Sequence, residues 1–333
     1  MAHRGKLLCI NRVRGTPAAK GGQHMDTQFE KYERALEAFF SEHARPEMSD
    51  RELEDLMDKF MDAYSSKAPG RVTPENAEAA EDFIELAESS TRIPEILKYA
   101  RKAQQKDPGN IDAMRMIALF STNNPYERLL MLEKAIKTAD QIMESEGFKE
   151  EDCIGNYWQI LETRPYMRLR NAYFDLLIDN RMMRRAAAEG EEMIRLNTND
   201  NMGIRFTLIH LYAYLEEEAP ALRLLGQYES GGIESRLSMA VSAMYFKLGR
   251  MDKAREYLDL LARRNPDTKK YFRAYKLDKL DKLDEIEYQM PGYGYRPNTI
   301  EELLENTGDY GFFYDDLKGF FLWADKQLVI KKK

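Results

Sequence analysis

Eight consecutive residues, 164–171, carry several side chains that could bind an anion. They read Arg-Pro-Tyr-Met-Arg-Leu-Arg-Asn, which places three arginines, a tyrosine and an asparagine in one short stretch. Guanidinium groups donate paired hydrogen bonds that match the geometry of carboxylates and phosphates. The stretch could therefore be an enzymic anion site, a surface that grips an acidic peptide, or a polar helix face that pairs with neighbouring acids. The elements that carry the arginines decide among these three.

The remaining sequence offers little for catalysis or metal binding. The four histidines are His3, His24, His43 and His210, and their spacing matches no metal-ligand pattern. Phosphate-loop, dinucleotide-binding and nucleophile-elbow patterns are absent from the sequence. We expect His210 to be a buried imidazole satisfied by its neighbours. The sequence therefore predicts no catalytic residue, no metal, no cofactor and a protein that is not an enzyme.

The charge balance bears on the partner. The formal net charge is −7, and residues 1–25 contain five basic residues and no acidic one, so the rest of the chain is more acidic still. An acidic body repels a phosphate backbone, which argues against nucleic acid as a partner. No apolar run reaches the roughly 18 residues of a membrane helix, which argues against a membrane. Two isolated cysteines, Cys9 and Cys153, suit a reducing compartment, and we expect a cytoplasmic protein.

The chain begins with two segments outside any repeat. Residues 1–25 are expected to be a disordered basic extension or a tag-like segment, with Met25 near the true start. Residues 26–76 show apolar positions at helical spacing and predict an N-terminal helical pair. Ser49 and Glu52 have the spacing of a capping box, in which each side chain satisfies the other residue's backbone N–H.

A helical hairpin pattern is clearest at residues 235–268. Small residues, Ser242 and Ala254, stand where two helices would have to approach closely. Gly249 suits a left-handed turn between them, and Pro266 would stop the second helix. This pattern resembles the tetratricopeptide repeat, a family of 34-residue helical hairpins.

The same frame fits other parts of the chain, which gives five units over more than half of its length. The predicted units are residues 77–110, 111–144, 167–200, 201–234 and 235–268. Residues 140–164 do not fit the period, so we expect one extended helix or an inserted segment there. The resemblance implies an all-α fold, an α-solenoid of tetratricopeptide-like helical hairpins.

In that family the first helices of successive units line a concave groove. The residues of this chain at or beside groove positions are Arg168, Asn171, Asp175, Arg205, Tyr212, Arg236, Phe246 and Lys247. The resemblance thus implies a non-catalytic scaffold or adaptor that binds a protein or peptide segment, and the arginines favour an acidic one. The alternative is an enzyme or enzyme-regulating subunit with its site in the N-terminal helices, around residues 37–62. The identity of the partner and the oligomeric state stay open.

The end of the chain is rich in aromatic residues. Residues 269–333 are expected to form a linker and a C-terminal helical cap, with Thr299 and Glu302 as a second capping box. The aromatic residues of this part include Phe312, Phe313, Tyr314, Phe320, Phe321 and Trp323. A solenoid must cover the apolar face of its last unit, so an aromatic capping helix is the first interpretation. A self-association surface or a docking patch for a partner is the second.

Overall fold

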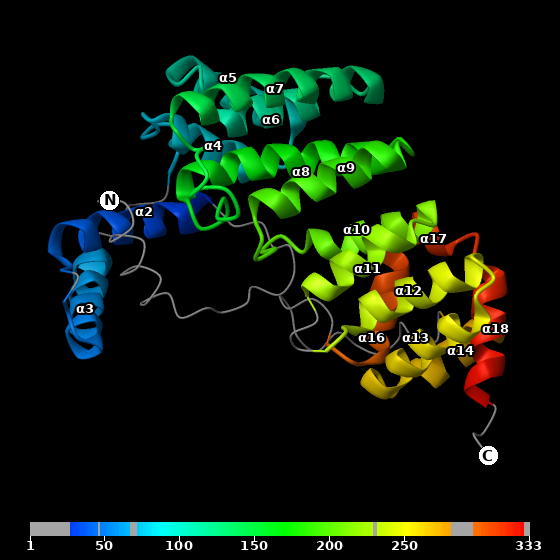
Figure 1. Cartoon of the computed structure of the whole chain (residues 1–333). Helices are drawn as coiled ribbons and strands as arrows, with labels where there is room; N and C mark the ends of the chain where they lie inside the picture. Colours follow the sequence, from blue (N-terminus) through cyan, green and yellow to red (C-terminus); the bar gives the residue numbers. More distant parts are fainter. Residues whose placement is uncertain (1–26, 46, 67–71, 229–231, 281–295, 330–333) are drawn as a thin grey trace. The chain divides into compact units, whose positions relative to one another are not determined.

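The computed structural model describes residues 27–45, 47–66, 72–228, 232–280 and 296–329. In these ranges every regular element is a helix, and the β-structure consists of isolated bridges (Figure 1). The all-α prediction is therefore confirmed. The predicted basic extension, residues 1–25, lies outside the described residues, and so do residues 281–295 of the predicted linker.

The described residues divide into two compact units, which are considered separately. The first is Met1–Leu176 with Arg195–Asn201, and the second is Leu177–Ile194 with Met202–Lys333. The helices that begin in the first unit are α2 (Thr27–His43), α3 (Asp50–Ser66), α4 (Ala80–Glu88), α5 (Ile93–Lys106), α6 (Ile111–Phe120), α7 (Pro125–Ser145), the short 3₁₀-helix η1 (Leu161–Thr163) and α8 (Arg164–Asp179). Those that begin in the second are α9 (Met183–Leu196), α10 (Ile204–Leu215), α11 (Glu218–Gln227), α12 (Ser235–Lys247), α13 (Met251–Arg264), α14 (Thr268–Lys276), α16 (Ile300–Asp309), α17 (Gly311–Tyr314) and α18 (Lys318–Val329).

Helices α2 and α3 pack against each other. Their buried apolar residues form one cluster, made of Leu36, Phe40, Leu53, Leu56 and Phe60. The predicted capping box begins α3: the Ser49 N–H donates to the Glu52 carboxylate at 2.8 Å, and the Glu52 N–H donates to Ser49 Oγ at 3.4 Å.

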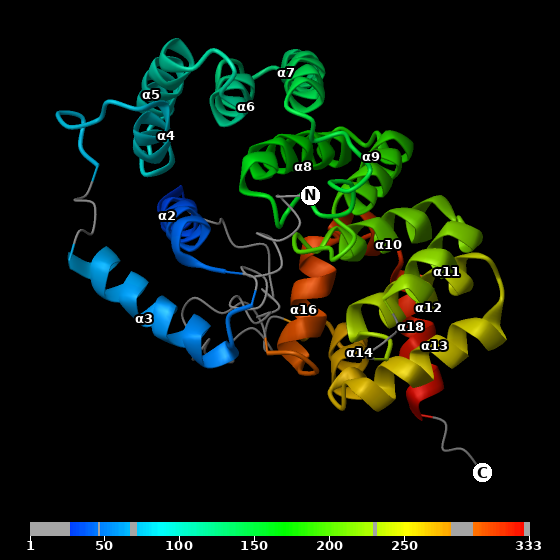
Figure 2. The same cartoon turned by 60° about the vertical axis from the view of Figure 1, so that its left-hand side comes forward.

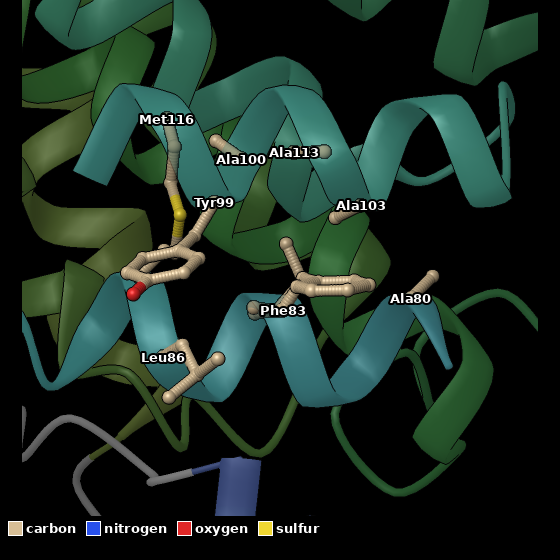
Figure 3. Close-up of a cluster of buried hydrophobic side chains, with 10 residues drawn as sticks. Ala80, Phe83, Leu86, Tyr99, Ala100, Ala103, Ala113 and Met116 are labelled. Carbon is tan, nitrogen blue, oxygen red and sulfur yellow. The ribbon is translucent and has the colours of Figure 1, made fainter. Parts of the chain in front are cut away.

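Helices α4, α5 and α6 share a second cluster, shown in Figure 3. It contains Ala80, Phe83, Ile84, Leu86, Ala87, Tyr99, Ala100, Ala103, Ala113 and Met116. The alanines of α5 and α6 in this cluster are fully buried, so their small side chains let the helices approach closely. Asn110 caps α6, because its side chain accepts a hydrogen bond from the Ala113 N–H at 2.9 Å.

The residues between α7 and α8 form an inserted, largely irregular segment. It is anchored by Tyr157, whose ring is fully buried and whose backbone N–H donates to the Leu196 carbonyl at 3.0 Å. The Thr163 hydroxyl donates to the Tyr157 carbonyl and fixes the chain just before α8 begins. The break that the sequence pattern indicated at residues 140–164 contains the end of α7 at Ser145 and this irregular segment, and its role as an insertion between repeats stays a prediction.

In the second unit, helices α12 and α13 form the close hairpin that the sequence predicts. Ser242 and Ala254 are fully buried, and Ser242 Oγ donates to the Ala254 carbonyl at 2.8 Å. Gly249 has φ +70° in the turn between the helices, where L side chains are strained. Each of the five predicted units contains two helices. That these hairpins stack as a tetratricopeptide solenoid stays a prediction.

The predicted capping box at Thr299 and Glu302 does not form. Thr299 Oγ donates to the Arg296 carbonyl, so it does not cap α16. The Glu302 carboxylate is buried and accepts from the Asn298 N–H at 2.8 Å and from Asn265 Nδ2 at 3.3 Å. The prediction was wrong because the Glu302 carboxylate bonds the Asn298 N–H, one residue before Thr299, and the side chain of Asn265.

The aromatic residues near the C-terminus pack on earlier helices of the second unit. Phe321 stacks on Tyr275 with ring centroids 4.0 Å apart, and Phe320 lies edge-on to Phe272 at 5.8 Å. The segment is therefore part of the core of this unit; its role as a solenoid cap stays a prediction. Within the ranges that the structure describes, no helix combines the length and apolarity needed to cross a bilayer.

Ala254→Leu tests the close hairpin. The larger side chain would lie between two helices already in contact, so we expect a loss of about 1–3 kcal/mol in the free energy of unfolding. Urea unfolding followed by Trp323 fluorescence measures it. Ala262→Leu, at a partly buried position of the same helix, is the control and should shift the midpoint less. Equal midpoints for Ala254→Leu and the wild type would contradict the packing.

Candidate functional site

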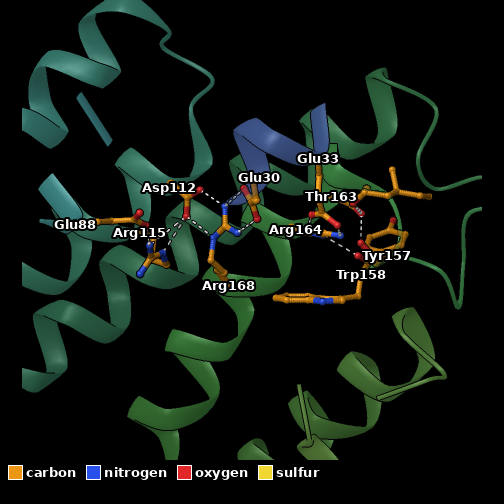
Figure 4. Close-up of polar contacts among 11 residues, drawn as sticks. Glu30, Glu33, Glu88, Asp112, Arg115, Tyr157, Trp158, Thr163, Arg164 and Arg168 are labelled. Atoms are coloured by element: carbon orange, nitrogen blue, oxygen red, sulfur yellow. Dashed lines mark hydrogen bonds and ion pairs between the residues drawn. The ribbon is translucent and has the colours of Figure 1, made fainter. Parts of the chain in front are cut away.

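The first two arginines of 164–171 lie on α8 and bind carboxylates of α2. The Arg164 side chain is only 3% exposed and forms an ion pair with Glu33. Its Nε also donates to the Trp158 carbonyl at 2.8 Å, and its guanidinium lies 5.6 Å from the centre of the Trp158 ring. Arg164 therefore holds α2 to the beginning of α8 (Figure 4).

Arg168, one helical turn later, is shared between two acids. Its Nε donates to Asp112 at 2.9 Å, and its terminal nitrogens bind Asp112 and Glu30. Burial alone would lower the pKa of Arg168, but the two carboxylates raise it above its ordinary value. The residue is thus a partly buried, fully charged link among α2, α6 and α8 (Figure 4).

Asp112 is the most strongly perturbed acid of this cluster. Burial would raise its pKa, but the neighbouring guanidiniums of Arg168 and Arg115 outweigh burial and hold the pKa at about 2. Arg115 Nε lies 3.2 Å from Asp112, and its NH2 lies 3.7 Å from Glu88 on α4. Asp112 also stands in the first turn of α6, where the helix dipole favours a negative charge.

In the contact between α2 and α4 the charges are reversed, because α2 supplies the cation and α4 supplies the acids. Lys31 Nζ lies 2.9 Å from Asp82 and 2.7 Å from Glu85, so a cation of α2 binds two acids of α4. Figure 2 shows α2 beside α4 and α8. Within the sequence Glu30-Lys31-Tyr32-Glu33 of α2, the two acids thus pair with arginines of α8 and the lysine pairs with acids of α4.

The remaining predicted groove residues of the first unit follow Arg168 on α8. Asn171 Nδ2 donates to Asp175 at 2.9 Å, and Asp175 is exposed. The structure therefore brings Arg168, Asn171 and Asp175 together on one helix, as their spacing predicts. The sequence reasoning missed Glu30, Lys31, Glu33 and Asp112. The charge pattern of α2 was visible in the sequence, but its target on α8 was not.

In the second unit, two predicted groove residues belong to α10. Arg205 NH2 lies 2.9 Å from Glu234, and its guanidinium lies 4.1 Å from the Phe206 ring centre. Tyr212 is buried, and its hydroxyl donates to Glu191 at 2.7 Å. Burial and that carboxylate raise the pKa of Tyr212 above its ordinary value.

The other three predicted groove residues lie on α12 and contact the C-terminal helices. Arg236 is bound by Asp309 at 2.7 Å and by the Tyr310 hydroxyl at 3.2 Å. The Phe246 ring packs on Phe320 and Trp323, with centroids 5.8 and 5.5 Å away. Lys247 Nζ donates to the Tyr214 carbonyl at 2.6 Å and lies 5.7 Å from the Phe313 ring centre. Helices α16–α18 thus cover the face of α12 that was assigned to a groove.

His210 is fully buried and satisfied by its neighbours, as the sequence predicts. Its Nδ1 lies 2.6 Å from the Phe206 carbonyl and its Nε2 lies 3.0 Å from the Tyr314 hydroxyl. The imidazole stacks on Tyr310 with ring centroids 3.8 Å apart. Burial lowers the pKa of His210 to about 3, and the nearby Arg236 charge acts in the same direction. The ring is therefore neutral at physiological pH.

The chemistry available at these positions is recognition by charge. In the part of the chain that the structure describes, no three side chains among His, Cys, Asp and Glu are grouped as a metal site. In the N-terminal helices, where the alternative enzyme site was expected, Ser49 and Glu52 cap α3. Whether the protein is an enzyme is not tested by these contacts, and the groove assignment also stays a prediction.

Comparison of the chain with protein-family models, with curated proteins and with solved structures returned no match. The resemblance to the tetratricopeptide repeat accordingly rests on the residues of this chain alone.

Asp112→Asn tests the buried cluster. We expect it to destabilise the first unit by about 3 kcal/mol at neutral pH, because two guanidiniums lose a buried counter-charge while Glu30 still binds Arg168. The Asp112 carboxylate has a folded pKa near 2, below its ordinary 3.8. It therefore stabilises the fold above about pH 4, and this contribution is lost as the pH falls towards about 2. The variant should lose less stability across that window than the wild type.

Urea unfolding followed by Trp158 fluorescence, in a Trp323→Phe background, isolates the first unit. Asp58→Asn, an exposed change on α3, is the control. The assignment fails if Asp112→Asn and Asp58→Asn unfold at the same urea concentration.

His210→Gln tests the buried imidazole. A folded pKa near 3 lies below the ordinary 6.5, so the unfolded chain binds more protons between these values. We expect the stability of the second unit to fall as the pH drops from about 7 to about 5, and this slope to flatten in His210→Gln. Urea midpoints followed by Trp323 fluorescence in a Trp158→Phe background give the slope. The exposed His43→Gln should keep it, and a slope that also persists in His210→Gln would contradict the assignment.

Proposed function

We propose that this protein is a non-catalytic interaction scaffold or adaptor built from tetratricopeptide-like hairpins. It binds a protein or peptide segment on the face of α8 that carries Arg168, which the resemblance assigns to a groove. The two isolated cysteines suit action in the cytoplasm. The proposal needs no cofactor.

One observation carries the proposal: Arg168, which the spacing assigned to a groove, already binds the carboxylate of another helix. Arg164 repeats the contact one turn earlier. A face that accepts carboxylates from α2 has the chemistry to accept them from an acidic partner, because charge-assisted hydrogen bonds to arginine are strong and directional. An acidic or carboxylate-bearing segment is therefore the favoured ligand.

The mutual pairing of the charges supports binding over catalysis. Asp112 is held ionised with a pKa near 2, far from the value of a general acid or base at neutral pH. Lys31 is likewise held in its charged form: burial opposes its charge, but Glu85 and Asp82 raise its pKa. Such groups attract and orient a charged segment without exchanging protons with it.

A random peptide display library, selected on the immobilised full-length chain, tests the proposal. We expect the enriched sequences to be acidic and to bind the purified chain in solution. A selection that enriches no sequence over an unrelated control protein would contradict the proposed function.

Asp175→Lys adds a test with an expected gain. The substitution replaces an exposed acid on the face of α8 that carries Arg168, so an enriched acidic peptide should bind about two- to fivefold more tightly, since an exposed charge pair contributes roughly 0.2–1 kcal/mol. Fluorescence anisotropy measures the affinity. Glu54→Lys makes the same charge change at an exposed position of α3 and should have a smaller effect. Equal affinities for the two variants would place the binding surface away from α8.

A further inference from the structure

The α2–α3 pair has an apolar core of its own. Leu36 and Phe40 of α2 are buried against residues of α3, and no residue of α4–α8 belongs to that cluster. The cluster shared by α4, α5 and α6 contains no residue of α2 or α3. Among the described residues, Glu30, Lys31 and Glu33 of α2 form ion pairs with later helices of the first unit. These ion pairs therefore tie the α2–α3 pair to α4 and α8 through charged side chains.

Four charged residues of α4 and α8 bind the charged side chains of α2 and form what we term the acceptor face: Arg164, Arg168, Asp82 and Glu85. The two arginines are four residues apart on α8, and the two acids are three residues apart on α4, so each pair lies on one side of its helix. A helix that fits this face must carry two acids three residues apart, with a base directly after the first acid. This pattern fixes both the direction and the register of the bound helix.

The acceptor face is held in place by groups other than those of α2. Arg168 is also bound by Asp112, and Arg164 donates to the Trp158 carbonyl. The Asp82 carboxylate accepts hydrogen bonds from two backbone N–H groups that precede α4, at 3.0 and 3.1 Å. These contacts would persist without α2, so the face is preorganised and a second helix would meet it at little ordering cost.

The seat of α2 is also reached by solvent. A small cleft of about 60 Å³ is lined by residues of α2, α4, α6 and α8, including Lys31 and Arg168. Arg34 of α2 and Glu81 of α4 line it and are exposed. Water and salt therefore reach the ion pairs of Lys31 and Arg168 that line this cleft, which makes their exchange easier than that of a sealed apolar contact.

We propose that the acceptor face is the docking surface for a helix of a partner protein with the pattern acid-base-x-acid, and that α2 is the resident helix which this partner displaces. The inference rests on the proposed function and makes it more specific. The chain binds its partner weakly while α2 is seated, because only the fraction of molecules with α2 released is competent to bind. Charge complementarity selects the partner, and the α2–α3 pair keeps its own core when it leaves.

A labelled synthetic peptide of residues 27–43 is the probe, titrated into the full-length chain by fluorescence anisotropy. Glu30→Gln with Glu33→Gln in the chain weakens the seat of α2 but leaves the acceptor face intact. We expect this variant to bind the peptide at least about tenfold more tightly than the wild type, as it should if α2 is seated in about nine molecules of ten or more. The same two substitutions in the peptide should abolish binding to the variant, and raising the salt from about 0.1 to about 1 M should weaken it.

Two controls keep the test decisive. Glu42→Gln with Glu47→Gln removes two exposed acids near the end of α2 and should bind the peptide as the wild type does. Lys31→Glu releases α2 in another way, through repulsion from Asp82 and Glu85. It replaces the Glu30→Gln, Glu33→Gln variant in the titration if that variant loses helicity. The inference is overturned if neither opened chain binds more tightly than the wild type, or if the glutamine peptide binds equally well.

Two further outcomes separate the alternatives. A wild-type chain that sediments as a dimer, and as a monomer after Glu30→Gln with Glu33→Gln, would assign the face to a second copy of this chain and overturn the partner assignment. Library peptides that bind the wild type and the opened variant equally would overturn this inference while the proposed scaffold function stands. A library selection that enriches nothing on either the wild type or the Glu30→Gln, Glu33→Gln variant would contradict the scaffold function itself.

Discussion

The first unit depends on one interaction, the sharing of Arg168 between Asp112 and Glu30. The Arg168 guanidinium is partly buried and needs counter-charges, because an unpaired buried charge costs several kcal/mol. Those counter-charges come from α6 and α2, so satisfying one side chain fixes the relation of three helices. Arg164 and Glu33 form a second ion pair between the same two helices, one turn earlier on α8. Two ion pairs fix the direction of α2 as well as its position.

The second unit meets the same requirement with its C-terminal helices. Arg236 is buried and takes its counter-charge from Asp309 of α16, beside a neutral His210 stacked on Tyr310. Here aromatic packing accompanies the charge, since Phe320 is fully buried against earlier helices. This contact combines a charge with a large buried apolar area, so it is harder to exchange than the contact of α2. In both units, an arginine of a predicted first helix thus binds a carboxylate of another helix. The contact in the second unit should open less readily than the contact of α2.

The sequence predicted the local features well, because their causes lie within a few residues. The turn at Gly249 and the close approach at Ala254 follow from side-chain size and backbone preference, and both are present. The positions of the arginines on one helix face were also predictable from spacing. The acids that bind these arginines were not predictable, because Glu30 is 138 residues from Arg168 in the sequence and no periodicity connects them. Glu302 shows a related limit: its carboxylate bonds the nearby Asn298 N–H and also the side chain of Asn265, which is 37 residues away in the sequence.

The chemistry of the α2 contact determines what it can do. A buried ion pair contributes little net stability relative to an apolar contact of the same shape, because desolvation offsets much of the Coulomb attraction. When such a contact opens, both partners are rehydrated, so opening costs less than exposing an apolar core. The α2–α3 cluster remains buried in either state, since its residues pack on one another. A helix held by charge, with its apolar side satisfied elsewhere, is therefore suited to exchange with another helix that carries the same charges.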